Sequence, residues 1–328
     1  MVKFVKRAEE EKKTEVVKSL ISTLLSILTP YTAGCPMNNI LWTNLTLMEI
    51  QNMLKTRLIS VSCPAINKIM KSLHFVKRKM QKCKTLKDVE NRDKQFKRIA
   101  RLIGFFTHLN LPVLSIDTKK KEMLGDFYRE GKVFCNQAIP VYDHDFKSFS
   151  DGTAVPHGIY DVSKNICYLS IGTNKDTAEF VADNIMYHWF NSIKKEYPNA
   201  QKMLIICDGG GSNSSSHYVV KEAFKNLAEK LQIQIHVAHY PPYCSKWNPI
   251  EHRAFSFLSK KWQGNVFRNH EIIKELSEKT TTKNGFAVKA YINEKVYQIG
   301  KKASDEFMEK MPVIFSKILP KWNYKFVC

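Results

Sequence analysis

Two short apolar runs that each end in one aspartate constrain the fold of this 328-residue chain most strongly. The run "LPVLSID" ends at Asp117, and the run "KMLIICD" ends at Asp208. Runs of this length between polar segments are typical of buried strands. Carboxylates at the ends of two strands in one sheet can converge if those strands are neighbours.

Strand-like and helix-like patterns follow one another after residue 111, which favours an α/β domain whose mixed sheet is flanked by helices. Expected strands cover 111–117, 133–146, 158–162, 166–172, 202–208 and 233–240, and expected helices cover 176–197, 217–231 and 250–262. The tail 280–311 reads as a small strand pair and a helix.

The segment "ICDGGGSN" around Asp208 could be a phosphate-binding loop, a tight turn or a place where a bare aspartate meets a metal. A Walker loop needs a lysine soon after its glycines, and none follows here. The dinucleotide pattern would need glycine at position 214, where Ser214 stands. An acid at the end of the strand repels phosphate unless a cation lies between them, so the pattern favours a metal.

A third candidate acid, Glu251, lies in "WNPIEHR". Asn248 suits a helix N-cap, Pro249 suits the first helical position, and Glu251 would then point from the first turn. The structural alternative is that Glu251 closes a capping box on Asn248. Competing acids are Asp143, Asp145 and Asp161, the last of which reads as a turn residue.

Positive charge is concentrated in the N-terminal third of the chain. The formal net charge is +20, and residues 1–110 hold 21 lysines and arginines against 8 acids. A field of this sign and size favours polyanions, and nucleic acid is the first candidate.

Two short helices in this basic region match a helix-turn-helix. The first would begin with a capping box of Thr46 and Glu49, and the second would be capped by Ser62 with Pro64 in its first turn. The predicted DNA contacts are Asn67, Lys68 and Lys71 on the second helix, with Lys77 and Arg78 in the segment that follows. The alternative is an ordinary helical hairpin whose lysines are only solvated.

The eight cysteines include no C-x-x-C pair, so zinc-ribbon and disulfide frameworks have little support. The N-terminus lacks an apolar signal core, and no segment is long and apolar enough to span a bilayer. We therefore expect a cytoplasmic, nucleoid-associated protein that does not bind membranes.

Several motifs in order resemble the Rhodopirellula-type family of insertion-sequence DDE transposases. They are "LSIDTKKKEMLGDF", "VYDHDF", "VPHGIYD", "ICDGGGSN", "PPYCSKWNPIEHRAFSF" and a "WNY" near the end. The "PPY…NPIE" block is also similar to that of the wider mariner-like group. The resemblance implies a ribonuclease-H-like core with Asp117, Asp208 and Glu251 as its acidic triad. The residue pattern described above places a small all-α helix-turn-helix domain before this core.

The resemblance also implies the chemistry. The triad would hold two Mg²⁺ (or Mn²⁺) ions for hydrolysis at transposon ends and transfer of the freed strand into target DNA. The partners would be terminal inverted repeats and target DNA, bound by a homodimer or higher assembly. Lys119, Asn213 and Asn248 are weaker candidates for contacts to the scissile strand.

The expected organisation is an N-terminal helix (1–34), a helix-turn-helix module (35–85), a helical linker (86–110), the catalytic domain (111–265) and a C-terminal α/β extension (266–328). The resemblance implies a further DNA-binding segment upstream of residue 20, so this copy is expected to be shortened there. Two other functions stay open: a truncated or co-opted DNA-binding repressor without catalysis, and a stand-alone ribonuclease-H-like nuclease.

Overall fold

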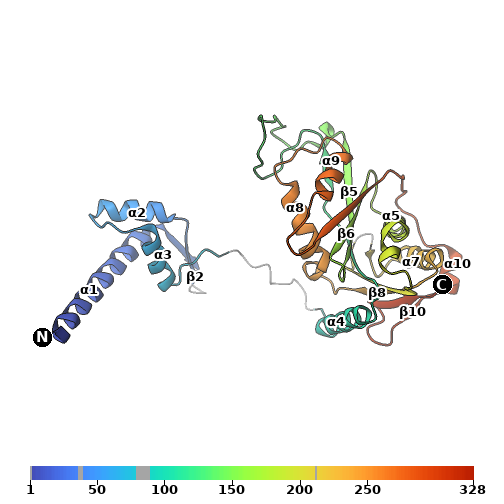
Figure 1. Ribbon diagram of the computed structural model, residues 1–328, viewed down its shortest axis with the longest axis horizontal. Coiled ribbons are helices and arrows are strands. Elements are labelled where there is room, and N and C mark those ends of the chain that lie inside the picture. The colour runs from blue at the N-terminus through green and yellow to red at the C-terminus, as the bar shows by residue number, and fades with distance from the viewer. Residues whose placement is uncertain (1, 36–39, 79–88, 211–212) are drawn as a thin grey trace. The chain divides into compact units, whose positions relative to one another are not determined.

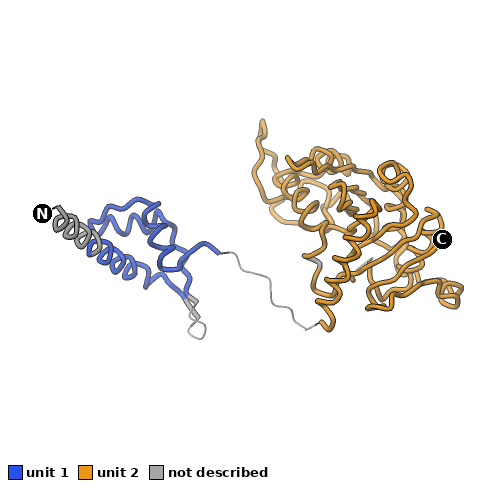
Figure 2. The backbone as a smooth tube through the Cα atoms, turned by 60° about the horizontal axis from the view of Figure 1, so that its bottom comes forward, with its two compact units in different colours: residues 1–84 blue, residues 85–328 orange. Residues whose placement is uncertain are grey.

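The computed structural model describes residues 2–35, 40–78, 89–210 and 213–328. The chain forms two compact units, residues 1–84 and residues 85–328 (Figure 2). The expected boundary at residue 85 and part of the basic segment 74–84 lie outside the described residues. None of the described helices combines the length and apolarity needed to cross a membrane.

The first unit contains the two predicted helices and their predicted caps. Its elements are α1 (Val2–Leu28), β1 (Thr32–Cys35), β2 (Ile40–Thr43), α2 (Leu47–Thr56) and α3 (Cys63–Ser72). The Thr46 hydroxyl accepts the Glu49 N–H at 3.2 Å, and the Glu49 carboxylate accepts the Thr46 N–H at 2.6 Å. The predicted capping box of α2 is therefore confirmed, and Ser62 caps α3 as expected.

One apolar core joins all three helices of this unit. Its buried members are Leu24, Ile27, Leu28, Ile50, Leu54, Ile66 and Met70. The helix expected as a separate segment at 1–34 thus shares a core with the helix pair. The unit also contains an antiparallel hairpin of β1 and β2, which was not predicted from the sequence.

The second unit is built on a nine-stranded mixed sheet (Figure 1). Its strands are β3 (Val113–Thr118), β4 (Glu122–Leu124), β5 (Gly152–Asp161), β6 (Ile166–Gly172), β7 (Lys202–Cys207), β8 (Gln234–His239), β9 (Ala287–Asn293), β10 (Ile314–Phe315) and β11 (Asn323–Phe326). The order is β10-β11-β8-β7-β3-β5-β6-β9, and β4 pairs with β5.

The centre of this sheet has the ribonuclease-H-like arrangement. Strands β3, β7 and β8 are parallel neighbours, whereas β5 runs antiparallel to both β3 and β6. The predicted mixed sheet flanked by helices is confirmed, whereas the unit expected to be all-α contains the β1–β2 hairpin. The segments expected as a linker (86–110) and an extension (266–328) contribute three helices and three strands to the same unit, and a functional subdivision within it stays a prediction.

Helices cover both faces of the sheet. They are α4 (Arg92–His108), α5 (Ala178–His188), α6 (Lys194–Glu196), α7 (Tyr218–Leu231), α8 (Ser256–Trp262), α9 (His270–Glu278) and α10 (Asp305–Lys310). On one face α5 and α7 pack through Ile185 and Phe224. On the other, α4 packs on β3, β7 and β8, while α8 and α9 pack on β5 and β6.

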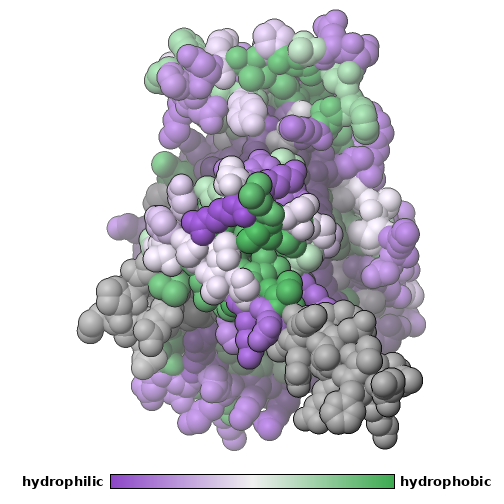
Figure 3. Space-filling view, turned by 90° about the vertical axis from the view of Figure 1, so that its left-hand side faces the viewer, coloured by the Kyte–Doolittle hydropathy of each residue, from purple (hydrophilic) through white to green (hydrophobic). Residues whose placement is uncertain are grey.

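The segment 125–151 between β4 and β5 is mostly irregular, so the strand expected at 133–146 is wrong. Phe127 is buried, but most large apolar side chains of this segment are exposed. Exposed large residues of this segment are Tyr128, Val133, Phe134, Ile139, Tyr142, Phe146 and Phe149. Hydrophobic residues are exposed at the top of the molecule in Figure 3, where this segment lies in Figure 1. The apolar residues at 133–146 resemble a strand in the sequence, but they pair with no strand in the structure.

The tail contains one strand and one helix where a strand pair and a helix were expected. Strand β9 runs parallel to the distant strand β6 instead of pairing with a neighbour in sequence. Helix α10 follows, and β10 and β11 then extend the opposite edge of the sheet beside β8.

Candidate active site

Asp117 and Asp208 lie at the same edge of the sheet. Asp117 is near the end of β3, and Asp208 directly follows β7. These strands are parallel neighbours, with Ser115 opposite Ile206. The convergence expected for the two strand ends is confirmed, because neighbouring parallel strands bring their carboxyl ends together.

A buried network brings the helix of Glu251 to the same edge. Asn248 is fully buried, and its amide donates to the Ile116 carbonyl at 3.0 Å. The Ser115 hydroxyl donates to the Asn248 side-chain oxygen at 2.5 Å and accepts the Ile250 N–H at 3.0 Å. The start of the helix is thereby tied to β3, two residues before Asp117.

This network corrects two expectations about Asn248. The helix begins at Pro249 as predicted, but the Asn248 side chain bonds across to β3 instead of capping it. A π-helical turn spans Glu251–Phe255, a local widening that is frequent at functional sites. Because the Asn248 amide is buried and bonded within the protein, it offers no group for a contact with DNA.

Gly158 makes room for this helix. It lies opposite Asp117 in the β3–β5 ladder. A Cβ atom at this position would stand 2.7 Å from side-chain atoms of both Ile250 and Phe255. Only glycine therefore allows the two large residues beside Glu251 to pack so closely on the sheet.

The carboxyl group of Asp117 is electrostatically crowded. Its pKa is raised to about 8, mainly by burial and also by the nearby carboxylates of Asp208 and Glu251, while the Thr118 N–H acts in the opposite direction. Asp117 and Glu251 share a side-chain hydrogen bond, which requires a proton on one of the two. Asp117 thus interacts with both of the other acids predicted from far-apart segments.

The donor set suits a hard divalent cation. It consists of carboxylate oxygens, which Mg²⁺ and Mn²⁺ prefer, and the mutual repulsion of the carboxylates is the kind that a cation between them relieves. Among the described residues, no three His, Cys, Asp or Glu side chains already stand in a metal-coordinating arrangement. Side-chain rotation would be needed to close the ligands around an ion.

Asp176 is a fourth acid near this site, and the sequence reading missed it. Its carboxylate accepts the Thr118 hydroxyl at 3.3 Å, and its charge contributes to the raised pKa of Asp208, whose main cause is burial. The sequence feature that could have indicated Asp176 is its position. Asp176 lies between a strand and a helix, as the expected acids do, but its partner Thr118 is distant in sequence.

The competing acid Asp161 has the structural role that was expected. It is fully buried, and its carboxylate accepts the N–H groups of Ser163 and Lys164 at 2.9 and 3.0 Å and the Tyr197 hydroxyl at 2.9 Å. These bonds fix the turn between β5 and β6.

The predicted DNA contacts fall into two groups. Asn67, Lys68, Lys71, Lys77 and Arg78 are all exposed in the first unit. In the second unit, the Lys119 ammonium pairs with Glu122 at 3.1 Å and lies 4.7 Å from the centre of the Trp262 ring. Lys119 is therefore engaged within the protein, whereas Lys120 and Lys121 are exposed.

Asn213 lies in the loop that follows Asp208 and is buried. Among the residues that the structure describes, its side-chain oxygen has no hydrogen-bond partner. A buried amide oxygen of this kind needs a donor or a cation.

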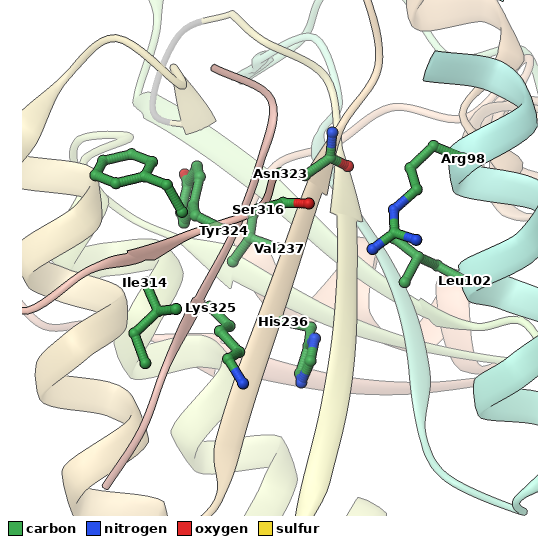
Figure 4. Close-up of a pocket in the computed structure, with 10 residues that line it drawn as sticks. Arg98, Leu102, His236, Val237, Ile314, Ser316, Asn323, Tyr324 and Lys325 are labelled. Atoms are coloured by element: carbon green, nitrogen blue, oxygen red, sulfur yellow. The ribbon is translucent and has the colours of Figure 1, made fainter. Parts of the chain in front are cut away.

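A pocket of about 210 Å³ lies away from these acids (Figure 4). Its lining residues are Arg98, Leu102, His236, Val237, Ile314, Phe315, Ser316, Asn323, Tyr324 and Lys325. None of the three acids lines it.

Comparisons with known proteins identify one family and a set of similar solved structures. The family described as "Rhodopirellula transposase DDE domain" matches residues 23–328. The chain is similar to the "Mos1 transposase paired-end complex with left transposon end", with 11% identity and a TM-score of 0.45 over 78% of this chain and 68% of that chain. It is also similar to the "Crystal structure of the Mos1 Strand Transfer Complex", with 11% identity, a TM-score of 0.44 and the same coverage. No curated protein matches the chain.

Proposed function

The chain belongs to the Rhodopirellula transposase DDE domain family, and from this we propose that Asp117, Asp208 and Glu251 are its catalytic acids. The protein is a DNA transposase, an enzyme that cuts and rejoins DNA at transposon ends. The observation that best supports the assignment is the interaction of Asp117 with both other acids in one partly buried cluster.

The enzyme depends on divalent metal, and we infer two ions, Mg²⁺ or Mn²⁺. When bound, such a pair activates water or a 3′-hydroxyl and stabilises the charge that develops on the phosphate. Asp117 interacts with both other acids and is the best candidate for a shared ligand, with Asp208 and Glu251 completing the two sites. Asn248 and Ser115 hold Glu251 toward Asp117.

DNA would bind through the exposed cations. In the first unit, Asn67, Lys68 and Lys71 project from α3, as groove-reading residues do in helix-turn-helix proteins, and Lys77 and Arg78 follow. In the second unit, Lys120 and Lys121 follow Asp117 closely and are better phosphate ligands than Lys119. The substrates are terminal inverted repeats and target DNA, which we place in the nucleoid of the cytoplasm.

A second copy of the chain is the proposed protein partner, because two transposon ends must be brought together. The exposed aromatic segment 125–151 supports this inference. Contiguous apolar residues on a surface commonly mark an interaction site. Two contacts attach this segment to the rest of the unit. Arg129 lies 3.8 Å from the centre of the Phe267 ring, and Arg268 pairs with Asp126 at 2.8 Å.

The decisive test is Asp208→Asn in a Mg²⁺- or Mn²⁺-dependent cleavage assay on a transposon end. We expect cleavage to be lost while end binding stays nearly unchanged, since the amide keeps the shape but not the charge. Asp143→Asn, which changes an exposed acid of the segment 125–151, is the matched control and should cut normally. Equal loss of cleavage and binding in Asp208→Asn would contradict a metal role.

A transposase that has lost catalysis and only represses its element is the second candidate. The retained acids and their mutual interaction favour the active enzyme. Inverted repeats on both sides of the gene would support transposition.

A further inference from the structure

The backbone at Asp208 has little rigidity of its own. Gly209 and Gly210 follow it directly, and a Cβ atom at either would meet nothing closer than 3.5 Å. Glycine restricts the backbone least. Within the turn the Asp208 carboxylate accepts the Gly210 N–H at 3.3 Å, which fixes it only to another flexible residue, so a contact from outside the turn is needed to hold the backbone of Asp208 itself.

His239 supplies a contact at this point. It ends β8, lies opposite Cys207 in the ladder and is fully buried. Its Nδ1 is 3.0 Å from the Asp208 carbonyl oxygen and 3.3 Å from the Cys207 sulfur, and its Nε2 is 2.7 Å from the Tyr324 hydroxyl. Both ring nitrogens are therefore used.

The partners determine the direction of these hydrogen bonds. A carbonyl oxygen only accepts, so Nδ1 must carry the proton and donate to Asp208. Nε2 of the neutral ring then accepts from the Tyr324 hydroxyl. The result is a chain of two hydrogen bonds that runs in one direction, from the Tyr324 hydroxyl through His239 to the backbone carbonyl of Asp208.

The final "WNY" motif anchors this chain. Its three residues are buried, and β11 pairs with β8 so that Tyr324 lies opposite Val237. The His239 N–H donates to the Trp322 carbonyl at 2.9 Å. Asn323 and Tyr324 point to different sides of β11 (Figure 4), and the Asn323 amide donates to Gln95 of α4 at 2.7 Å. Strand β11, which carries Tyr324, is thus held from both faces of the sheet.

Lys221 holds the far end of the same turn. It is buried, and its ammonium donates to the Ser215 carbonyl at 2.5 Å while lying 5.5 Å from the centre of the Tyr324 ring. Tyr324 therefore contacts the groups that hold both ends of the turn.

We propose that His239 and Tyr324 are positioning residues that fix the backbone of Asp208, so that its carboxylate faces Asp117 and can share a metal ion with it. This inference rests on the proposed function of Asp208 as a metal ligand. It assigns a task in the active site to the "WNY" motif, which is far from Asp208 in sequence.

The test compares two variants of His239, each of which keeps a nitrogen at the place of only one of the two ring nitrogens. In His239→Asn the amide nitrogen can replace Nδ1, and in His239→Gln it replaces Nε2. We expect His239→Gln to weaken Mn²⁺ binding by about 10-fold or more, as is usual when a group that orients a ligand is removed, and His239→Asn to weaken it less. Tyr324→Phe, which removes only the hydroxyl, should also weaken it. The measurement is a Mn²⁺ titration of the full-length protein followed by electron paramagnetic resonance.

The control is His236→Gln, on the same strand, where the imidazole bonds Gln234 at 2.8 Å and lies away from Asp208. It should bind Mn²⁺ normally. If Asp208→Asn binds Mn²⁺ like the parent protein, the proposed function fails. If Asp208→Asn weakens binding but Tyr324→Phe and both His239 variants do not, the positioning role fails alone. Should the His239 variants not fold, Tyr324→Phe decides, and unchanged binding by it overturns the proposal.

Discussion

At the scale of single residues, the crowding of Asp117 makes the metal-free protein sensitive to pH. Its pKa is about 8 in the folded protein and 3.8 in a free side chain. Below pH 4 it is protonated in both states and contributes nothing. Between pH 4 and 8 only the unfolded chain releases the proton, so stability falls as pH rises. Above pH 8 the penalty is constant.

Asp117→Asn should therefore stabilise the metal-free protein at high pH while abolishing cleavage. We expect the melting temperature at pH 8.5 in chelator to rise by roughly 5 °C, since about 1 kcal/mol shifts it by about 2–4 °C in a domain of this size. At pH 4 the two proteins should melt alike. Differential scanning fluorimetry at both pH values measures this. An equal rise at both would contradict the charge explanation.

Gly158→Ala should separate Glu251 from Asp117. Its new Cβ would lie 2.7 Å from Ile250 and Phe255, so the helix must shift. Overpacking of this kind costs about 1–3 kcal/mol of unfolding free energy, and cleavage should fall at least tenfold. Gly104→Ala is the matched control, because nothing lies within 4 Å of its Cβ on α4. That variant should keep its activity and gain up to about 1 kcal/mol of stability.

At the scale of elements, the cap of α2 tests the independence of the first unit. Thr46→Ala removes a side chain that accepts the Glu49 N–H and should destabilise this unit by about 1 kcal/mol. DNA binding should weaken as the unit opens, whereas melting of residues 85–328 should not change. Thr56→Ala, at the other end of α2, is the control. Calorimetry of the full chain measures the melting of both units. A shift of both melting transitions in Thr46→Ala would contradict the independence of the first unit.

Elements with strong local patterns were predictable from the sequence. The strand expected at 166–172 matches β6, and the helix expected at 217–231 matches α7 within one residue. The errors have one cause. Pairing of β9 with β6, and the absence of pairing at 133–146, depend on contacts far along the chain that no local pattern records.

The same division applies to the candidate site. Asp117 and Asp208 could be found because each ends an apolar run, but Glu251 needed the family resemblance to favour it over a capping role. Gly158, Asp176 and the pair of His239 and Tyr324 could not be found. Their importance arises from strand register and from packing between distant segments.

At the scale of the whole molecule, a net charge of +20 should make DNA binding steeply dependent on salt. Replacing both Lys68 and Lys71 by alanine removes two phosphate contacts if α3 enters the groove. The slope of log affinity against log salt should then fall by about 2. Lys274→Ala is the control, since that lysine pairs with Glu278 at 2.8 Å on α9. Fluorescence anisotropy measures this slope. An unchanged slope in the double variant would mean that DNA does not bind at Lys68 and Lys71.

The position of β11 in the chain has a consequence for synthesis. This strand follows the other strands of the sheet in chain order, yet it pairs with β8 beside Asp208. Units near the N-terminus fold first as a chain leaves the ribosome. A nascent transposase can therefore fold its basic helical unit well before translation reaches the strand that steadies a catalytic acid. If the first unit binds DNA and Tyr324 positions Asp208 as proposed, the emerging enzyme would bind DNA before it could cut it.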